Sequence, residues 1–140
     1  MEPRISVITL GVTDLQRAVD FYASGLGLQL DGEFDAEQDG IAFFQLNPNL
    51  RLALYPWDKL AEDAGQPASG QGFRGVTVAH NVRQKEQVDA VIEQALEAGA
   101  ELVKQPEEVF WGGYSGYFAD PDGHLWEIAF NPHDSVVETG

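Results

Sequence analysis

Glu127 is the residue whose surroundings in this sequence most suggest chemistry. It lies in HLWEIAF, over 124–130, directly after Asp-Pro-Asp-Gly at 120–123. A carboxylate among aromatic residues can bind a metal ion, accept a proton or hold a cationic group. His124 is the nearest imidazole along the chain. The first question is therefore whether His124 and Glu127 share a site.

The expected strand geometry separates these two side chains. HLWEIAF has the composition of a strand, and side chains on a strand alternate between its faces, so residues three apart point to opposite sides. His80 and His133, the other two histidines, are expected to be ordinary strand-end or surface residues. Ser115 has no base that the sequence places beside it. The chain has no cysteine, which excludes thiolate ligands, a Cys nucleophile and disulfides.

The elements that must position Glu127 occur twice in the chain. The first copy has a predicted strand over 5–12 and a helix with an apolar stripe from Leu15. Thr13 and Gln16 have the spacing of a capping box, and Gly25 is placed to end the helix. Three further strands are expected over 28–34, 41–46 and 50–56.

The second copy repeats this order. A strand is expected over 73–80, with Asn81 as the cap of a helix whose apolar stripe begins at Val88 and which ends at Gly99. Strands over 101–110, 112–119 and 124–130 follow, and Asp-Pro-Asp-Gly is expected to join the last two as a hairpin.

The duplication predicts an α+β fold with two β-α-β-β-β modules. We expect module 1 over about 5–57, a linker over 58–72 and module 2 over about 73–131. A copy of roughly 55 residues alone has a marginal core, so the two modules are expected to form one domain over 1–140.

Charge and composition narrow the classes of partner. The formal net charge is −15, from 23 acidic and 8 basic residues, which disfavours nucleic acid and anionic membranes. A neutral or cationic small molecule remains compatible. No apolar run approaches the roughly 20 residues that a membrane helix needs. The first residues do not have the pattern of a secretory signal, so a cytoplasmic location is expected.

Two motifs and the duplication together resemble a known family. VTDLQRAVDFYASGLGLQL, followed later by GYFADPDGHLWEIAFNP, is similar to the glyoxalase/bleomycin-resistance/dioxygenase family, also called the vicinal oxygen chelate superfamily. The resemblance covers roughly 5–132. It implies curved mixed sheets around a cavity, helices on the outside, and assembly as a homodimer.

The resemblance also implies where a divalent metal would be bound. Its His, Glu or Gln ligands correspond to Val7, a position near Leu52, Gly75 (or Thr77 if the alignment shifts by two) and Glu127. Val, Leu and Gly side chains have no lone-pair donor for a metal, and Thr fits poorly. Only Glu127 is retained, so no metal and no other cofactor are expected, with a divalent metal kept as the alternative.

Strand alternation divides the aromatic residues around Glu127. If Glu127 faces the cavity, then Trp126 and Ile128 should lie against the helices. In the preceding strand, Ser115 and Tyr117 fall in one set and Tyr114 in the other.

Most aromatic residues in such a fold belong to the core, and a pocket with apolar walls and few polar groups is the usual form of a small-molecule site. The expected ligand-binding residues lie at strand ends or beside glycines: Trp57, Phe110, Trp111, Tyr114 and Tyr117.

Three functions remain open at this stage. The first is a metal-free protein that binds a small, apolar or aromatic organic ligand, with sequestration of a cationic drug as one form. The second is a metal-dependent lyase, isomerase or dioxygenase of the same superfamily, so enzymatic activity is not decided. The third is a structural or regulatory module with a filled cavity. For Glu127, a ligand contact or structural role is favoured over the catalytic role of a general base.

Overall fold

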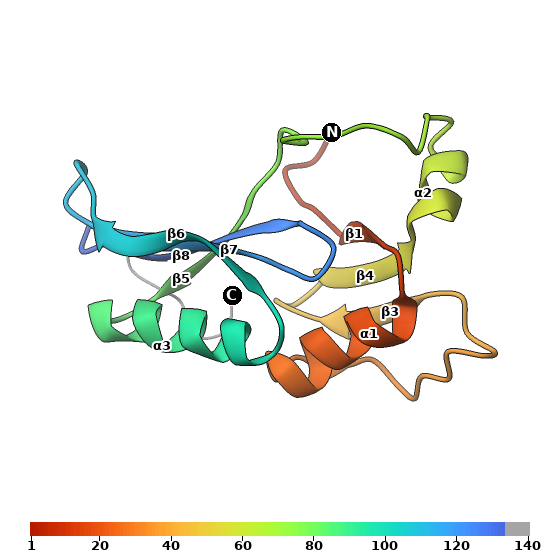
Figure 1. The fold of residues 1–140 in the computed structure, drawn as a ribbon, viewed down its shortest axis with the longest axis horizontal. Coiled ribbons are helices and arrows are strands. Elements are labelled where there is room, and N and C mark those ends of the chain that lie inside the picture. Colours follow the sequence, from red (N-terminus) through yellow and green to blue (C-terminus); the bar gives the residue numbers. More distant parts are fainter. Residues whose placement is uncertain (134–140) are drawn as a thin grey trace. The chain divides into compact units, whose positions relative to one another are not determined.

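The protein is described by a computed structural model over residues 1–133. The contacts divide the chain into two compact units, the first over Met1–Gly72 and the second from Phe73 onward. Within the described residues, each unit has one four-stranded mixed sheet and at least one helix, which gives an α+β fold (Figure 1). Both sheets are open, with β1 and β2 at the edges of one and β5 and β6 at the edges of the other.

Unit 1 follows the predicted β-α-β-β-β order. Its sheet has the strand order β1-β4-β3-β2, with β1 parallel to β4 and the other pairs antiparallel. Its elements are β1 (Val7–Val12), α1 (Leu15–Asp20), the π-helical turn η1 (Phe21–Gly25), β2 (Gln29–Leu30), β3 (Ala42–Gln45), β4 (Arg51–Pro56) and α2 (Trp57–Asp63). The expected linker over 58–72 therefore begins inside a short helix.

The first helix begins and ends differently from the prediction. Asp14, not Thr13, is the N-cap, and its carboxylate accepts a hydrogen bond from the Arg17 backbone N–H at 3.0 Å. The cap predicted at Thr13 is therefore wrong by one position. Aspartate is at least as good a cap as threonine, which is consistent with this shift. The left-handed backbone that follows the helix is at Gly27, with φ 77°, rather than at Gly25.

The core of unit 1 lies between α1–η1 and one face of its sheet. Tyr22 and Phe44 are fully buried, with their ring centroids 6.1 Å apart, and Leu52 is opposite Phe44 in the sheet. The other face carries Val7, Gln45 and Arg51, and we call it the pocket face of unit 1.

Unit 2 repeats the arrangement with a longer helix. Its sheet has the order β5-β8-β7-β6, and β5 is parallel to β8. Its elements are β5 (Val78–Val82), α3 (Lys85–Glu97), β6 (Glu101–Glu108), β7 (Tyr114–Ala119) and β8 (Leu125–Phe130).

The start of unit 2 also differs from the prediction. The strand expected over 73–80 begins only at Val78, and Asn81 lies within it instead of capping the helix. Gln84 is the N-cap of α3, in a capping box with Gln87. The reciprocal side-chain bonds of that box stabilise the helix start at a residue type that single-residue preferences do not favour.

One face of the unit 2 sheet packs against α3. Phe118 and Trp126 lie side by side on this face as nearly parallel rings, with centroids 6.3 Å apart. A Cβ atom on Gly116 would lie 2.9 Å from Ile92 of α3, and Gly116 is opposite the buried Ile128. The expected burial of Trp126 and Ile128 against the helix is confirmed.

The predicted hairpin at 120–123 is also confirmed. The Gly123 N–H donates to the Asp120 carbonyl at 2.9 Å, and β7 pairs antiparallel with β8. The buried Asp120 carboxylate accepts the N–H groups of Asp122 and His124 at 2.9 and 2.8 Å. This Asx-type bonding explains why aspartate opens the turn.

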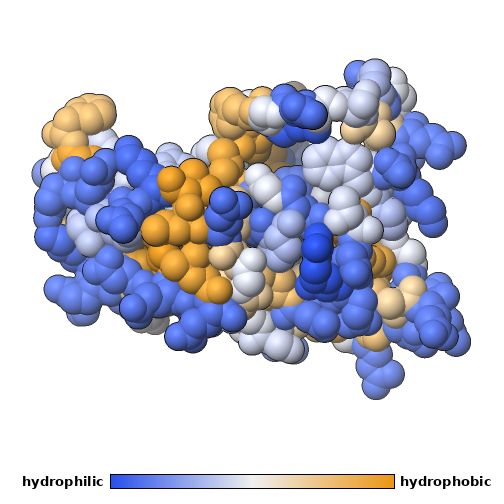
Figure 2. All heavy atoms as spheres, in the orientation of Figure 1, coloured by the Kyte–Doolittle hydropathy of each residue, from blue (hydrophilic) through white to orange (hydrophobic). Residues whose placement is uncertain are grey.

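The visible surface is largely hydrophilic, with an apolar patch among the polar side chains (Figure 2). Within residues 1–133, no helix combines the length and the apolar character that a membrane span requires.

Candidate functional site

The pocket face of unit 2, opposite α3, carries a concave site that contains Glu127. The cavity has a volume of about 350 Å³, within the size range of small-molecule sites. Its walls come from β6, β7, β8 and the loop between β6 and β7. The lining residues are Lys104, Glu107, Glu108, Val109, Phe110, Trp111, Ser115, Tyr117 and Glu127.

A row of three polar side chains crosses this sheet. Tyr117 of β7 is opposite Lys104 of β6 on one side and Glu127 of β8 on the other. Directly opposed residues in antiparallel strands point to the same face, so the row forms the floor of the cavity. Ala79 of β5 continues the row beyond Glu127 and adds no polar atom.

The Tyr117 hydroxyl donates a hydrogen bond to the Glu127 carboxylate. Burial, the negative charge of Glu127 and this hydrogen bond together raise the pKa of Tyr117. The phenol is therefore protonated at neutral pH and acts as a donor. Ser115, two residues earlier on the same strand face, is buried and adds a hydroxyl to the wall.

The loop between β6 and β7 forms an aromatic rim. The Val109 N–H donates to the Gly113 carbonyl, and the Gly112 N–H donates to the Val109 carbonyl, both at 3.0 Å. The Trp111 ring lies on Gly113, where a Cβ atom would be 1.7 Å from it. Phe110 is fully exposed. The missing side chain at Gly113 thus allows Trp111 to fold over the loop.

The charges in the lining differ in how they are neutralised. Lys104 pairs with Glu107 at 3.1 Å, and Glu108 pairs with Lys85 of α3. Glu127 instead accepts a hydrogen bond from the neutral Tyr117. Its carboxylate therefore contributes negative charge to the cavity floor, among aromatic side chains.

Two residues expected to bind ligand lie elsewhere. Tyr114 faces α3, where its hydroxyl donates to Asp89 at 2.9 Å and its ring lies 4.8 Å from the Lys85 ammonium. That hydrogen bond to Asp89 is the main cause that raises the pKa of Tyr114. Trp57 belongs to unit 1. Its ring lies on Gly11, where a Cβ atom would be 3.1 Å from it, and its indole N–H donates to the Ala68 carbonyl.

Phe110, Trp111, Tyr117 and Glu127 line the same pocket in unit 2. Sequence reasoning missed Lys104 as their neighbour. Irregular pairing on both sides of Lys104 in β6 changes the alternation of side chains there. The Pro-Glu-Glu run that follows it was the available signal for an irregular strand.

The positions that the family resemblance assigned to metal ligands are divided between the two units, with Val7 and Leu52 in unit 1 and Gly75, Thr77 and Glu127 in unit 2. Leu52 is buried on the sheet face that also carries Phe44, and Arg51 is the residue opposite Val7. Gly75 and Thr77 precede β5 and are exposed. The assignment near Leu52 therefore falls on the opposite strand face from Val7, and Thr77 lies just outside β5.

None of the histidines shares the pocket with Glu127. His80 is opposite Ile128 and so lies on the other face of the sheet from Glu127. His124 precedes β8, where its N–H is held by Asp120, and His133 is exposed. In the part of the chain that the structure describes, no three His, Asp or Glu side chains are grouped so as to hold a metal ion.

Comparison with known proteins places this geometry in a family. The model of the Glyoxalase/Bleomycin resistance protein/Dioxygenase superfamily matches residues 4–128. An uncharacterized protein of Mycobacterium bovis is 28% identical over 128 residues, which cover 91% of this chain and 83% of that protein.

Solved structures show the same fold. A glyoxalase-related enzyme from Fulvimarina pelagi is 35% identical, with a TM-score of 0.85 over 99% of this chain and 95% of that one. A glyoxalase/bleomycin resistance protein/dioxygenase from Nocardioides is 27% identical, with a TM-score of 0.72 over 100% and 91% of the two chains. The resemblance inferred from the two sequence motifs is confirmed.

Proposed function

Because the chain belongs to the Glyoxalase/Bleomycin resistance protein/Dioxygenase superfamily, we propose that it binds a small, apolar or aromatic organic molecule in the pocket of unit 2. The observation that carries this proposal is the convergence of Phe110, Trp111, Tyr117 and Glu127 on one cavity of about 350 Å³. Aromatic walls with a few polar groups are the common composition of a small-molecule site.

The charge on the floor favours a ligand with a cationic group. Glu127 contributes a carboxylate, and the faces of Trp111 and Tyr117 attract cations through their ring quadrupoles. Glu107 and Glu108 are already paired with lysines, so Glu127 is the group that a ligand cation would approach. The net charge of −15 also favours a cationic ligand at long range.

The proposed site works without a divalent metal. Glu127 is one carboxylate beside a phenol, and a stable metal site needs several lone-pair donors that converge on the ion. In unit 2 the neighbours of Glu127 across the sheet are Tyr117 and Ala79, neither of which is an imidazole or a carboxylate.

The test uses a cationic probe and a neutral one. We expect benzyltrimethylammonium to bind, and benzyl alcohol to bind at least roughly tenfold more weakly, as measured by calorimetry. Glu127→Gln should remove most of this preference. Glu93→Gln, which makes the same charge change at an exposed position of α3, should leave it intact. Equal affinity for the two probes, or equal effects of the two variants, would contradict a cation site at Glu127.

A metal-dependent lyase, isomerase or dioxygenase is the second candidate. The feature that favours it is Glu127 itself, which occupies the one family ligand position retained in this chain. Metal analysis of the purified protein distinguishes the candidates. A stoichiometric divalent ion that is lost in Glu127→Ala would support the enzyme and overturn the metal-free proposal.

We also propose that the chain forms a homodimer, as the family resemblance implies. Several large apolar side chains are exposed in the single chain, among them Phe73 and Val76. Light scattering of the purified protein tests this proposal, and a monomer at high concentration would refute it.

A further inference from the structure

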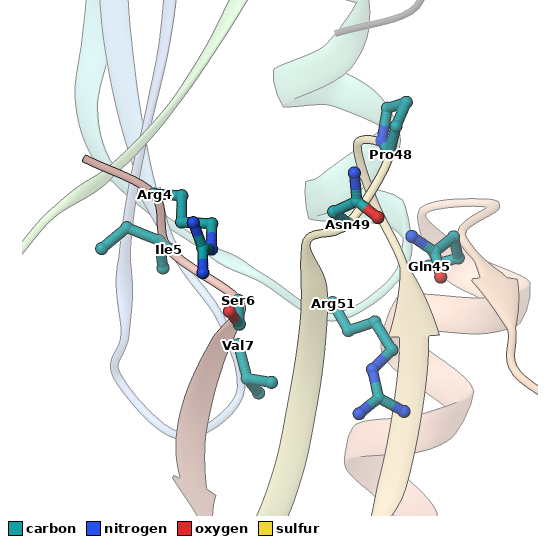
Figure 3. A pocket seen from close by; sticks show the side chains of 8 residues that line it. All are labelled: Arg4, Ile5, Ser6, Val7, Gln45, Pro48, Asn49 and Arg51. Carbon is teal, nitrogen blue, oxygen red and sulfur yellow. The ribbon is translucent and has the colours of Figure 1, made fainter. Parts of the chain in front are cut away.

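Unit 1 has a pocket of its own, on its pocket face, at the start of β1 and β4. Its volume is about 690 Å³. One side comes from the residues that lead into β1, and the other from β3, β4 and the turn between them (Figure 3). The lining residues are Arg4, Ile5, Ser6, Val7, Gln45, Pro48, Asn49 and Arg51.

The ionised side chains that line this pocket are positive, whereas the whole chain has a negative net charge. Its ionised lining groups are the guanidinium groups of Arg4 and Arg51, and none of its lining residues is acidic. The chain has only 8 basic residues and a net charge of −15, so two arginines in one pocket form a local reversal of charge. The Ser6 hydroxyl and the side-chain amides of Gln45 and Asn49 add polar groups.

Arg51 is positioned by its neighbours on the sheet. Its guanidinium carbon lies 4.2 Å from the centroid of the Phe43 ring, and Gln45 is directly opposite it in β3. The nearest carboxylate oxygen in an ion pair with it belongs to Asp31, at 3.6 Å. This distance is beyond hydrogen-bond range, so Asp31 attracts the guanidinium without fixing its donors.

The Arg4 side chain is held less firmly than that of Arg51. It pairs with Glu2 of the same N-terminal segment, and both side chains are exposed. An exposed pair of this kind contributes little free energy, so an incoming anion can compete with Glu2.

The walls beside the arginines are apolar. Ile5 and Val7 are exposed on one side, and Pro48 lies on the other side, in the β3–β4 turn. A guanidinium group presents a planar fork of donors that matches a carboxylate. The pocket therefore combines a carboxylate-binding group with surface that would cover a hydrocarbon body.

We propose that this pocket binds a small organic carboxylate, with its carboxylate on Arg51 and its apolar part against Val7, Ile5 and Pro48. None of its lining residues lines the pocket proposed as a site in unit 2, and the inference does not depend on that function. The overall negative charge does not prevent such binding, because distant charges are screened over about 8–10 Å at moderate salt.

The test uses benzoate, its neutral analogue benzamide, and inorganic phosphate. We expect benzoate to shift the NMR signals of Val7 and Arg51 and to bind roughly tenfold or more tightly than benzamide, because it forms charge-assisted hydrogen bonds. Arg51→Met should weaken benzoate binding by a similar factor. Arg51→Lys should retain part of it, since charge remains but the fork is lost.

Arg83→Met is the matched control, because it removes one positive charge from an exposed position of unit 2. It should leave benzoate binding unchanged. Circular dichroism of the Arg51 variants checks that each is folded, and Arg51→Lys provides the comparison if Arg51→Met is not. The proposal is overturned if benzoate does not bind, or if benzamide or phosphate binds with equal affinity. It is also overturned if Arg83→Met weakens benzoate binding as much as the Arg51 variants do.

Discussion

At the scale of single residues, the contact between Tyr117 and Glu127 decides the chemistry of the unit 2 pocket. Partial burial, the negative charge of Glu127 and a hydrogen bond to its carboxylate raise the pKa of Tyr117, so the phenol keeps its proton. Glu127 in turn keeps a neutral hydrogen-bond partner. Lys104 pairs with Glu107, and Lys85 pairs with Glu108. The negative charge of Glu127 is therefore the one that a cationic ligand would approach.

Glu127→Gln should lower the pKa of Tyr117 toward the ordinary value of about 10, because the charge that opposes phenolate formation is removed. Alkaline titration of phenolate absorbance measures this shift. The difference between each protein and its Tyr117→Phe counterpart isolates the signal of Tyr117. An unchanged pKa would show that burial alone raises it.

The same pair should contribute to the pH dependence of stability. Since the folded pKa of Tyr117 is raised, its contribution is complete below the unfolded value of about 10 and is lost as the pH rises through the folded value. Tyr117→Phe should therefore lose less stability than the wild type above about pH 10. Urea unfolding from neutral to alkaline pH measures the difference, and parallel curves would contradict it.

At the scale of elements, the pocket depends on how the loop after β6 folds. Trp111 lies on Gly113, and Gly113 in turn lies near the Phe130 carbonyl of β8. The aromatic rim is thus joined to the strand that carries Glu127. Any side chain at 113 must displace the ring or the strand.

Gly113→Ala should move Trp111 and destabilise the protein by about 1–3 kcal/mol, the usual cost of overpacking. A Cβ atom there would lie 1.7 Å from the Trp111 ring and 2.6 Å from the Phe130 carbonyl oxygen. Tryptophan fluorescence and urea unfolding measure the two effects. Gly40→Ala is the control, since nothing lies within 4 Å of a Cβ at that position. Equal stability of the two variants would contradict the packing described here.

The strands show what the sequence could and could not predict. Alternation alone placed Trp126 and Ile128 against α3, and it also separated Tyr114 from Tyr117, three residues apart. Tyr114 was nevertheless expected to line the pocket, although the same alternation argued against it. Trp57 could not be placed in this way, because its contact with Gly11 joins residues that are far apart in sequence.

The helix starts illustrate a different limit. Thr13 and Asn81 are good caps by residue type, but Asp14 and Gln84 are the caps in the structure. Thr13 and Asp14 are neighbours of similar preference and differ by little free energy as caps. Gln84 is not a favoured cap by residue type, and its reciprocal side-chain bonds with Gln87 stabilise the helix start instead.

At the scale of the whole molecule, charge is the dominant feature. Two units of similar architecture carry pockets of opposite local sign within a chain of net charge −15. The 23 acidic side chains outnumber the 8 basic ones, and hydrophilic residues cover most of the face seen in Figure 2. Mutual repulsion among these carboxylates opposes the compact state.

We therefore expect NaCl to stabilise the fold. The thermal midpoint should rise by a few degrees between about 0.02 and 0.5 M salt, as the screening length falls from tens of ångströms to a few. Thermal unfolding followed by circular dichroism measures this rise. The double variant Glu93→Gln/Glu97→Gln is altered at exposed positions of α3, and its thermal midpoint should depend less on salt. An equal or larger dependence in that variant would contradict the repulsion argument.

The Asp-Pro-Asp-Gly turn also bears on the order in which the chain acquires its structure. Strands β7 and β8 are joined by this short turn, whose hydrogen bonds to Asp120 close locally. The parallel pairings β1–β4 and β5–β8 instead require long loops to close. We expect the β7–β8 hairpin to form on a microsecond timescale and the parallel pairings to form later. Tyr117 and Glu127 would then meet at an early stage of folding, before the sheet around them is complete.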